Sequence, residues 1–213
     1  MYITWLGLNC FKIQTNNAII LTDPYGVGTG LKMPRTQADI VTVSQNNDAQ
    51  FNNVSKISGN PFVVVNPGEY ERNQVFIHAK ADQLNGRPIQ SGFSVQCFFE
   101  AEKITLGHLG ALSHALSDKQ LEIFEGVDVL MLPIGGKPYL AAEEAAQVIS
   151  QVEPRIVIPM YYKSPGLKTN LNSLNKFLAT MGIKSSEELD KLKILKRDLP
   201  QDETKIIILK PKS

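Results

Sequence analysis

The chain has 213 residues, of which 43% are hydrophobic and 20% are charged, and its formal net charge at pH 7 is +1. This composition is typical of a soluble globular protein, so we expect one domain that spans residues 1–213. A chain this close to neutrality gives no reason to expect nucleic acid or an anionic membrane as a partner.

The cysteine pattern and the N-terminal residues help to predict the cellular compartment. Cys10 and Cys97 are the two cysteines, and they form no CxxC pair, so a zinc ribbon or a thioredoxin-like motif is excluded. The opening residues MYITWLGLNCF lack the pattern of a signal peptide. No window reaches the roughly 18 apolar residues that a membrane span needs. We therefore expect a cytoplasmic protein with two buried thiols.

The first two-thirds of the chain have the pattern of short strands separated by turns. Apolar runs or alternation of strand length occur at 1–7, 10–15, 18–24, 38–44, 61–71, 74–81, 92–101 and 103–110. The pair Asn16-Asn17 fits a tight hairpin turn between the second and third strands. Pro67-Gly68 is expected to end the strand at 61–71.

Helices enter in the last third of the chain. Residues 117–126 predict a short helix with Ser117 as its N-cap, and 140–154 predict an amphipathic helix that stops before Pro154. A further helix is expected at 170–182, closed by Gly182. Strands are expected at 127–136, 155–162, 191–200 and 204–211. Hairpins followed by β–α–β units predict an α/β fold, a four-layer αββα sandwich.

Seven sequence blocks together resemble one family. In chain order they are TWLGLNCF, ILTDPY, ADIVTVSQNNDAQ, VVNPGEYE, KITLGHLGALSHALS, VLMLPIGG and RIVIPMYY. Their order and spacing are similar to those of the metallo-β-lactamase superfamily, and most of all to its ascorbate-lactonase-like (UlaG-like) branch. The resemblance extends from Ile3 to Leu209 and implies the same αββα sandwich.

The resemblance also implies a metal site. Members of the family carry a loop of the type T/S-H-x-H-x-D-H after the strand that is ADIVTV here, and the loop binds two metal ions, zinc or manganese. Imidazole and carboxylate suit such ions. The metal lowers the pKa of a bound water to about 7 and so supplies hydroxide for hydrolysis.

This chain departs from the family pattern at every ligand position. The four positions of the loop carry Gln45, Asn47, Ala49 and Gln50. The family's later Asp falls on Ala111, its late His falls on Tyr161, and the His expected after Gly7 is Leu8. Carboxamides are weak neutral donors and alanine donates nothing. We therefore expect no metal and no other cofactor, and a hydrogen-bonded polar plug in place of the site.

The favoured hypothesis is a pseudoenzyme that keeps the fold for a binding, scaffolding or subunit role. Its partner would be a small molecule or a protein, and a homo-oligomer is a further possibility. The alternative is a hydrolase with a residual single-metal site through Asp48, His108 and His114. Against this alternative, the two histidines could be a hydrogen-bonded structural pair inherited from the family.

The candidate residual pocket comprises Asp23, Asp48, Glu69, His108 and His114. Either carboxylate of Asp48 and Glu69 could serve as a general base with one of the histidines, although the spacing alone does not bring them together. Asp23 follows a strand and is expected to orient the next loop by hydrogen bonds. The expected role of Tyr161 is to fill the volume that a metal site would occupy.

Overall fold

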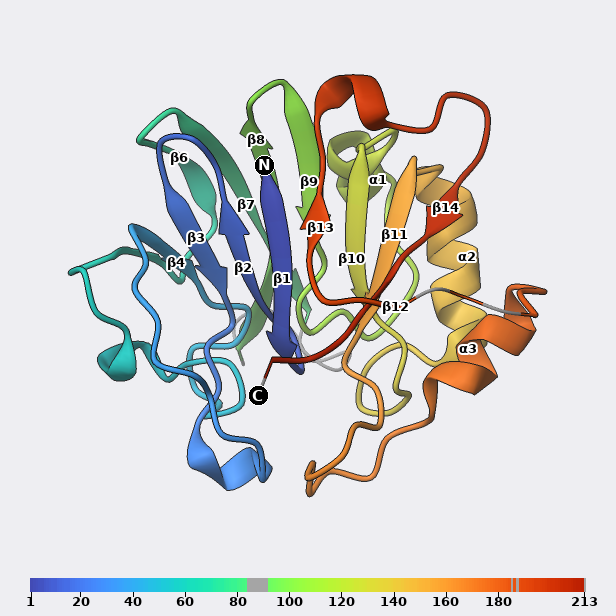
Figure 1. Cartoon of the computed structure of the whole chain (residues 1–213), viewed down its shortest axis with the longest axis horizontal. Coiled ribbons are helices and arrows are strands. Elements are labelled where there is room, and N and C mark those ends of the chain that lie inside the picture. Colours follow the sequence, from blue (N-terminus) through green and yellow to red (C-terminus); the bar gives the residue numbers. More distant parts are fainter. Residues whose placement is uncertain (84–91, 185, 187, 213) are drawn as a thin grey trace.

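A computed structural model of the chain describes residues 1–83, 92–184, 186 and 188–212. Two large β-sheets dominate it, one with six strands and one with seven, and a small two-stranded sheet accompanies them (Figure 1). The predicted two-sheet core is therefore confirmed.

The first sheet contains most of the N-terminal strands. Its order is β13 (Leu192–Lys193), β1 (Tyr2–Gly7), β2 (Cys10–Gln14), β3 (Ile19–Thr22), β4 (Ile40–Thr42) and β5 (Phe62–Val64). The neighbouring pairs among β13, β1, β2 and β3 are antiparallel, whereas β3, β4 and β5 run parallel to one another. The predicted hairpin turn at Asn16-Asn17 is confirmed, since the N–H of Thr15 donates to the carbonyl of Ala18 at 2.9 Å.

The second sheet holds the remaining long strands. Its order is β14 (Lys205–Ile206), β11 (Ile156–Met160), β10 (Val129–Pro133), β9 (Ile104–His108), β8 (Phe93–Ala101), β7 (Val75–Gln83) and β6 (Gly68–Arg72). Strands β9, β10, β11 and β14 are parallel, and β6 to β9 are antiparallel. The small sheet pairs β12 (Glu188–Leu189) with β15 (Ile208–Leu209).

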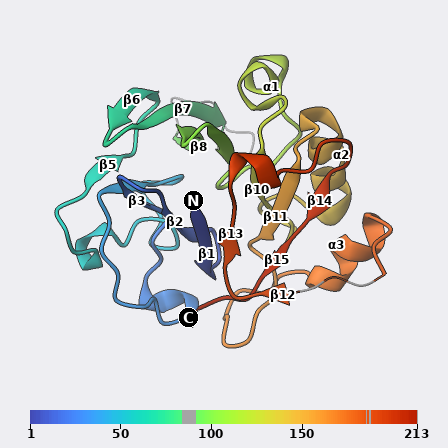
Figure 2. The ribbon, with the colours of Figure 1, turned by 45° about the horizontal axis from the view of Figure 1, so that its top comes forward.

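The α-helices of the described chain lie on the side of the second sheet (Figures 1 and 2). They are α1 (Asp118–Phe124), α2 (Ala142–Val152) and α3 (Leu174–Thr180). Ser117 is the N-cap of α1, as predicted, and its N–H donates to Oε1 of Gln120 at 2.9 Å. The 3₁₀ turns η1 (Val27–Thr29) and η2 (Val54–Lys56) are the short helical pieces that follow strands of the first sheet.

Three of the predicted strands are wrong in detail. The segment 204–211 forms two two-residue strands, β14 and β15, in different sheets. The segment 61–71 forms two strands in different sheets, β5 and β6, because Pro67 has no N–H for a ladder and Gly68 turns the chain with a φ of +153°. The segment 191–200 contains only the two-residue β13, followed by the 3₁₀ turn η4 (Lys196–Asp198). The carboxylate of Asp198 accepts the N–H of Leu195 at 3.2 Å and favours that turn.

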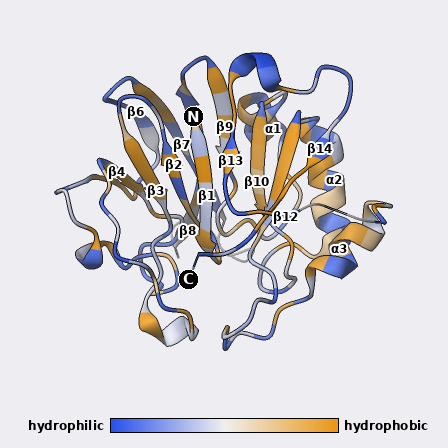
Figure 3. Ribbon diagram, viewed as in Figure 1, coloured by the Kyte–Doolittle hydropathy of each residue, from blue (hydrophilic) through white to orange (hydrophobic). Residues whose placement is uncertain are grey.

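One hydrophobic cluster fills the space between the sheets. Trp5 and Phe11 contribute from the first sheet, and Phe99 and Leu106 contribute from the second, all at most 1% exposed. In Figure 3 many strand segments, such as β10 and β11, are orange for hydrophobic residues, and blue hydrophilic segments are frequent in the outer loops. This continuous core fixes the strand ends relative to one another, and those ends carry the candidate site.

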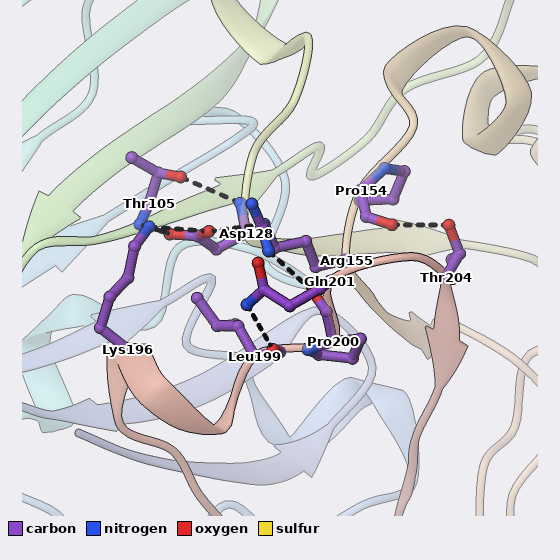
Figure 4. Close-up of polar contacts among 9 residues, drawn as sticks. All are labelled: Thr105, Asp128, Pro154, Arg155, Lys196, Leu199, Pro200, Gln201 and Thr204. Carbon is purple, nitrogen blue, oxygen red and sulfur yellow. Dashed lines mark hydrogen bonds and ion pairs between the residues drawn. The ribbon is translucent and has the colours of Figure 1, made fainter.

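The chain between β13 and β14 connects the first sheet to the second. Strand β13 pairs with β1 and strand β14 pairs with β11, so residues 192–206 cross from one sheet to the other. Asp128 is buried beneath this crossing, where its carboxylate accepts Lys196 Nζ at 2.8 Å and the N–H of Thr105 at 2.9 Å (Figure 4). Arg155 reinforces the crossing by donating to the carbonyl of Pro200 at 2.7 Å.

Candidate functional site

Parallel strands bring several loops to one edge of the molecule. The carboxyl ends of β3 and β4 meet in the first sheet, and those of β9, β10 and β11 meet in the second. Loops that leave the carboxyl ends of parallel strands are the usual place for a ligand site in α/β proteins. All seven positions that the resemblance assigns to metal ligands lie in or beside such loops or in the turn after β1.

Asp23 anchors the loop that follows β4. Its Oδ1 accepts the N–H of Ser44 at 2.6 Å, and its Oδ2 lies 2.7 Å from Ser44 Oγ. These are the loop-orienting hydrogen bonds expected of this residue. Burial raises the pKa of the Asp23 carboxyl to about 8, although the hydrogen bonds from Ser44 oppose that rise. At pH 7 the carboxyl is therefore mostly protonated.

The turn after β9 packs directly on the same loop. Gly110 has a φ of +50°, and a Cβ at this position would collide with the side chain of Ser44. Asn9 fixes the turn from the first sheet by donating its Nδ2 to the carbonyl of Gly110 at 3.2 Å. Ala111, at the position of the family's later Asp, is 1% exposed in this turn and offers only a methyl group.

Leu8 and Tyr161 lie side by side although they come from different sheets. The N–H of Tyr161 donates to the carbonyl of Leu8 at 3.1 Å, and the Nε1 of Trp5 donates to the same carbonyl at 2.9 Å. Both Leu8 and Tyr161 have positive φ values and are 1% exposed. The structure thus brings together two positions that the resemblance assigns to metal-binding histidines.

Three aromatic rings fill the space between these loops. Tyr161 stands edge-on to Tyr139 with 4.8 Å between ring centroids, and Phe51 lies 5.8 Å from Tyr139 and 6.5 Å from Tyr161. The Tyr161 hydroxyl donates to Oε1 of Gln50 at 3.2 Å, and Nε2 of Gln45 donates to the Tyr139 hydroxyl at 3.1 Å. We call these five side chains the aromatic plug.

The hydrogen bonds of the plug join amides to aromatic residues. The amides of Gln45 and Gln50 bond to tyrosine hydroxyls, not to each other. Sequence reasoning missed Tyr139 and Phe51, because Tyr139 sits in the loop after β10, far along the chain. The available signal was that this loop and residues 44–50, which we call the Gln-rich loop, both follow strands whose ends meet at one edge.

The tyrosine hydroxyls of the plug stay neutral. Burial raises the pKa of Tyr161 to about 12, and the negative charge of Asp48 adds to the rise. The pKa of Tyr139 is raised still further, chiefly by burial and then by Tyr161 and Asp48. Asp48 itself accepts the N–H of Gln50 at 2.8 Å and so closes the loop on itself. The plug is therefore a set of neutral hydrogen-bonding groups beside one carboxylate.

The two candidate histidines have separate partners. His108 is 1% exposed, its Nε2 lies 2.9 Å from the carbonyl of Asn9, and burial lowers its pKa to about 4. It is therefore neutral and donates that hydrogen bond. His114 is partly exposed, with Nδ1 2.8 Å from the carbonyl of Ala115 and Nε2 3.2 Å from Oδ2 of Asp82.

Glu69 lies apart from the other candidates. It is exposed on strand β6, where it pairs in register with His78 of β7. Asp23 and Asp48 lie in loops of the first sheet, and neither shares a hydrogen bond or ion pair with His108 or His114. The structure thus brings Asp48 to the aromatic plug but does not gather the five candidates into one pocket.

The side chains at the edge do not fit a zinc or manganese site. Among residues 1–83, 92–184, 186 and 188–212, no three His, Cys, Asp or Glu side chains are close enough together to hold a metal ion. The seven assigned positions supply two alanines, a leucine, a tyrosine and three carboxamides. Zinc in proteins takes thiolate, imidazole or carboxylate ligands, and these positions offer none of the three.

The exposed side of the Gln-rich loop borders a hollow. Asn47, at the family's second His position, lines it together with Asn46, Val65, Asn66 and Phe93, and its volume is about 610 Å³. Asn46 is held in place by Asn52, whose Nδ2 lies 2.7 Å from its Oδ1. Asn47 thus faces open space and does not join the plug.

Comparison with known proteins identifies relatives along most of the chain. The profile of the Beta-lactamase superfamily domain matches residues 2–161. A UPF0173 metal-dependent hydrolase of Listeria welshimeri is 26% identical, with 77% of this chain and 86% of the relative covered. A UPF0173 protein of Pyrococcus abyssi is 27% identical, with 78% and 85% covered.

Solved structures agree with these matches. A crystal structure from Thermotoga maritima, provisionally named a Zn-dependent hydrolase of the metallo-β-lactamase superfamily, is 30% identical. It superposes with a TM-score of 0.80, and the match covers 98% of this chain and 99% of that one. The predicted α/β fold of metallo-β-lactamase type is therefore confirmed. Within the described residues, no helix has the length and apolar content to cross a membrane.

Proposed function

The chain belongs to the metallo-β-lactamase superfamily, and on that premise we propose that it is a metal-independent binding protein of this family. It would have abandoned hydrolysis at the family site and kept the scaffold for binding a small molecule or a protein in the cytoplasm. We assign it to the ascorbate-lactonase-like branch on the residue blocks described above.

The aromatic plug is the observation that carries this proposal. Tyr161 and Gln50 occupy two assigned ligand positions, and they hydrogen-bond to each other at 3.2 Å. Tyr161 and Gln50 thus pair with each other at positions where the resemblance implies metal-binding side chains. Neutral groups at these positions also remove the repulsion that a cluster of acids without metal would suffer.

The names of the relatives favour a second candidate function. Several are called metal-dependent hydrolases, which supports a hydrolase with an unusual single-metal site. The ligands proposed for such a site, Asp48, His108 and His114, are committed to different backbone and side-chain partners. We therefore rank this function below the metal-independent one.

Restoration of the ligands tests the proposal. The restored chain would carry Gln45→His, Asn47→His, Ala49→Asp, Gln50→His, Ala111→Asp and Tyr161→His. We expect Zn²⁺ titration calorimetry to show saturable binding to the restored chain and none to the native chain, because imidazole and carboxylate would replace amide and methyl groups. A control with only Ala49→Asp and Ala111→Asp should bind far more weakly.

Two results would count against the proposal. Saturable zinc binding by the native chain would contradict the loss of the metal site. A restored chain that folds, as judged by circular dichroism, and yet binds no zinc would contradict the assignment of ligand positions on which the proposal rests.

A further inference from the structure

A second hollow, with a volume of about 650 Å³, lies between residues 25–36 and residues 49–58. These segments follow β3 and the Gln-rich loop, on the side of the molecule away from the α-helices (Figure 1). The volume is in the range of pockets that hold drug-sized ligands. Of the seven assigned metal positions, only Ala49 lines this hollow, so it is distinct from the aromatic plug.

Hydrogen bonds between the two segments hold the walls of the hollow in place. Three such bonds are Gly26 N–H to Ala49 O at 2.9 Å, Asn53 Nδ2 to Tyr25 O at 3.1 Å, and Ser58 N–H to Thr36 O at 3.2 Å. A ligand would therefore enter a preformed site and would not have to order its walls.

The lining is largely apolar. Met33, Pro34 and Ile57, all half-buried, contribute apolar surface to it, and Val27 stands at its edge with 87% of its surface exposed. A valine this exposed leaves hydrocarbon in contact with water, which a bound apolar group would cover. The lining therefore favours a ligand with a hydrocarbon body.

The charged residues of the lining all have the same sign. Lys32, Arg35 and Lys56 line the hollow, and no Asp or Glu lines it. None of the three forms an ion pair with another residue that the structure describes. Three unpaired cations beside apolar surface are complementary to one anionic group attached to an apolar body.

We propose that this hollow, which we call the cationic hollow, binds an amphiphilic monocarboxylate. Its hydrocarbon body would lie against Met33, Pro34 and Ile57, and its carboxylate would lie among Lys32, Arg35 and Lys56. This inference goes beyond the proposed function, because the hollow would bind such a ligand whether or not the family site holds metal.

The test uses decanoate as the probe and the full native chain. Isothermal titration calorimetry should show saturable binding of one decanoate per chain, weakened by added NaCl because the charged groups are exposed. Decanol has the same hydrocarbon body without the charge, and decyltrimethylammonium reverses the charge. Decanol should bind more weakly than decanoate, and decyltrimethylammonium should not bind.

A charge variant identifies the contribution of the three cations. The chain with Lys32→Gln, Arg35→Gln and Lys56→Gln should bind decanoate about tenfold more weakly, because exposed ion pairs are individually weak and add up to about this factor. The matched control is Lys119→Gln, Lys163→Gln and Lys210→Gln, which removes the same charge at exposed lysines elsewhere. Its decanoate affinity should equal that of the native chain.

The location of the ligand is checked by NMR. On titration with decanoate, the amide signals of residues 26–36 and 49–58 should shift more than those of the second sheet. Absence of saturable binding, equal weakening in the two charge variants, or shifts centred elsewhere would each overturn the inference. Because none of these readouts involves metal, they separate its failure from a failure of the proposed function.

Discussion

At the scale of single residues, Asp23 makes the stability of the protein depend on pH. Its carboxyl is fully buried with a pKa of about 8, whereas an exposed Asp ionises near pH 4. The unfolded chain therefore releases this proton at a lower pH than the folded chain. The folded state loses stability relative to the unfolded state as pH rises from about 4 to about 8.

The substitution Asp23→Asn removes this titration and keeps the shape of the side chain. An amide can still accept the N–H of Ser44 and can donate to its hydroxyl. We expect the free energy of unfolding of the variant, relative to the native chain, to rise by up to a few kcal/mol between pH 5 and pH 8.5. Urea unfolding at both pH values measures it.

The exposed Asp202→Asn serves as the control for charge alone. Its stability relative to the native chain should change little over the same pH interval. If Asp23→Asn and Asp202→Asn behaved alike, Asp23 would already be ionised in the folded protein at neutral pH.

Tyr161 contributes to the aromatic plug through both its ring and its hydroxyl. Tyr161→Phe removes only the hydrogen bond to Gln50 and should lower the free energy of unfolding by about 1 kcal/mol. Tyr161→Ala also removes the packing against Tyr139 and Phe51 and should cost about 3–5 kcal/mol. Equal costs for the two variants in chemical denaturation would contradict the packing role of the ring.

Residue positions could be predicted from the sequence only where a motif marks them. The blocks around Gln45 and Tyr161 assign these residues to one site, and the structure does bring the Gln-rich loop and Tyr161 together. Tyr139 belongs to no such motif. Its place in the plug depends on how the loop after β10 folds back, and local sequence does not encode that contact.

At the scale of elements, the C-terminal crossing depends on one buried carboxylate. Asp128 has 3% of its side chain exposed and pairs with Lys196 and Arg155 (Figure 4). Asp128→Asn should destabilise the protein by about 2 kcal/mol, because it weakens charge-assisted hydrogen bonds to a buried group. Hydrogen exchange should show the largest loss of protection in residues 192–206.

A matched substitution on the partner tests the same contact. Lys196→Met keeps much of the side-chain volume and removes the charge, and because Lys196 is half exposed its loss alone should cost less than Asp128→Asn. The double variant should be less destabilised than the sum of the two single variants. Strict additivity would show that the Asp128–Lys196 pair does not hold the crossing.

Long periodic elements were predictable, and short pairing segments were not. The amphipathic pattern and Pro154 located α2, and alternation located β8. The last strands are only two residues long, and each depends on a distant partner, as β13 depends on β1. An apolar run such as 204–211 cannot reveal that β14 and β15 pair with different sheets.

At the scale of the whole molecule, the fold brings the seven assigned ligand positions to one edge, although none of them carries a thiolate, an imidazole or a carboxylate. Strand ends from both sheets converge there, and the core between the sheets fixes their relative positions. The family resemblance predicted this architecture. The aromatic plug gives this edge packing and hydrogen bonds of its own.

The metal content of the native chain decides whether the protein has lost the metal site of its family. The protein would be purified without a metal-binding tag, incubated with excess Zn²⁺ and Mn²⁺, desalted, and analysed by elemental mass spectrometry. We expect near-zero metal per chain, because the seven assigned positions provide no thiolate, imidazole or carboxylate. Retention of about one metal ion per chain would contradict it and would make His108 and His114 the first residues to substitute.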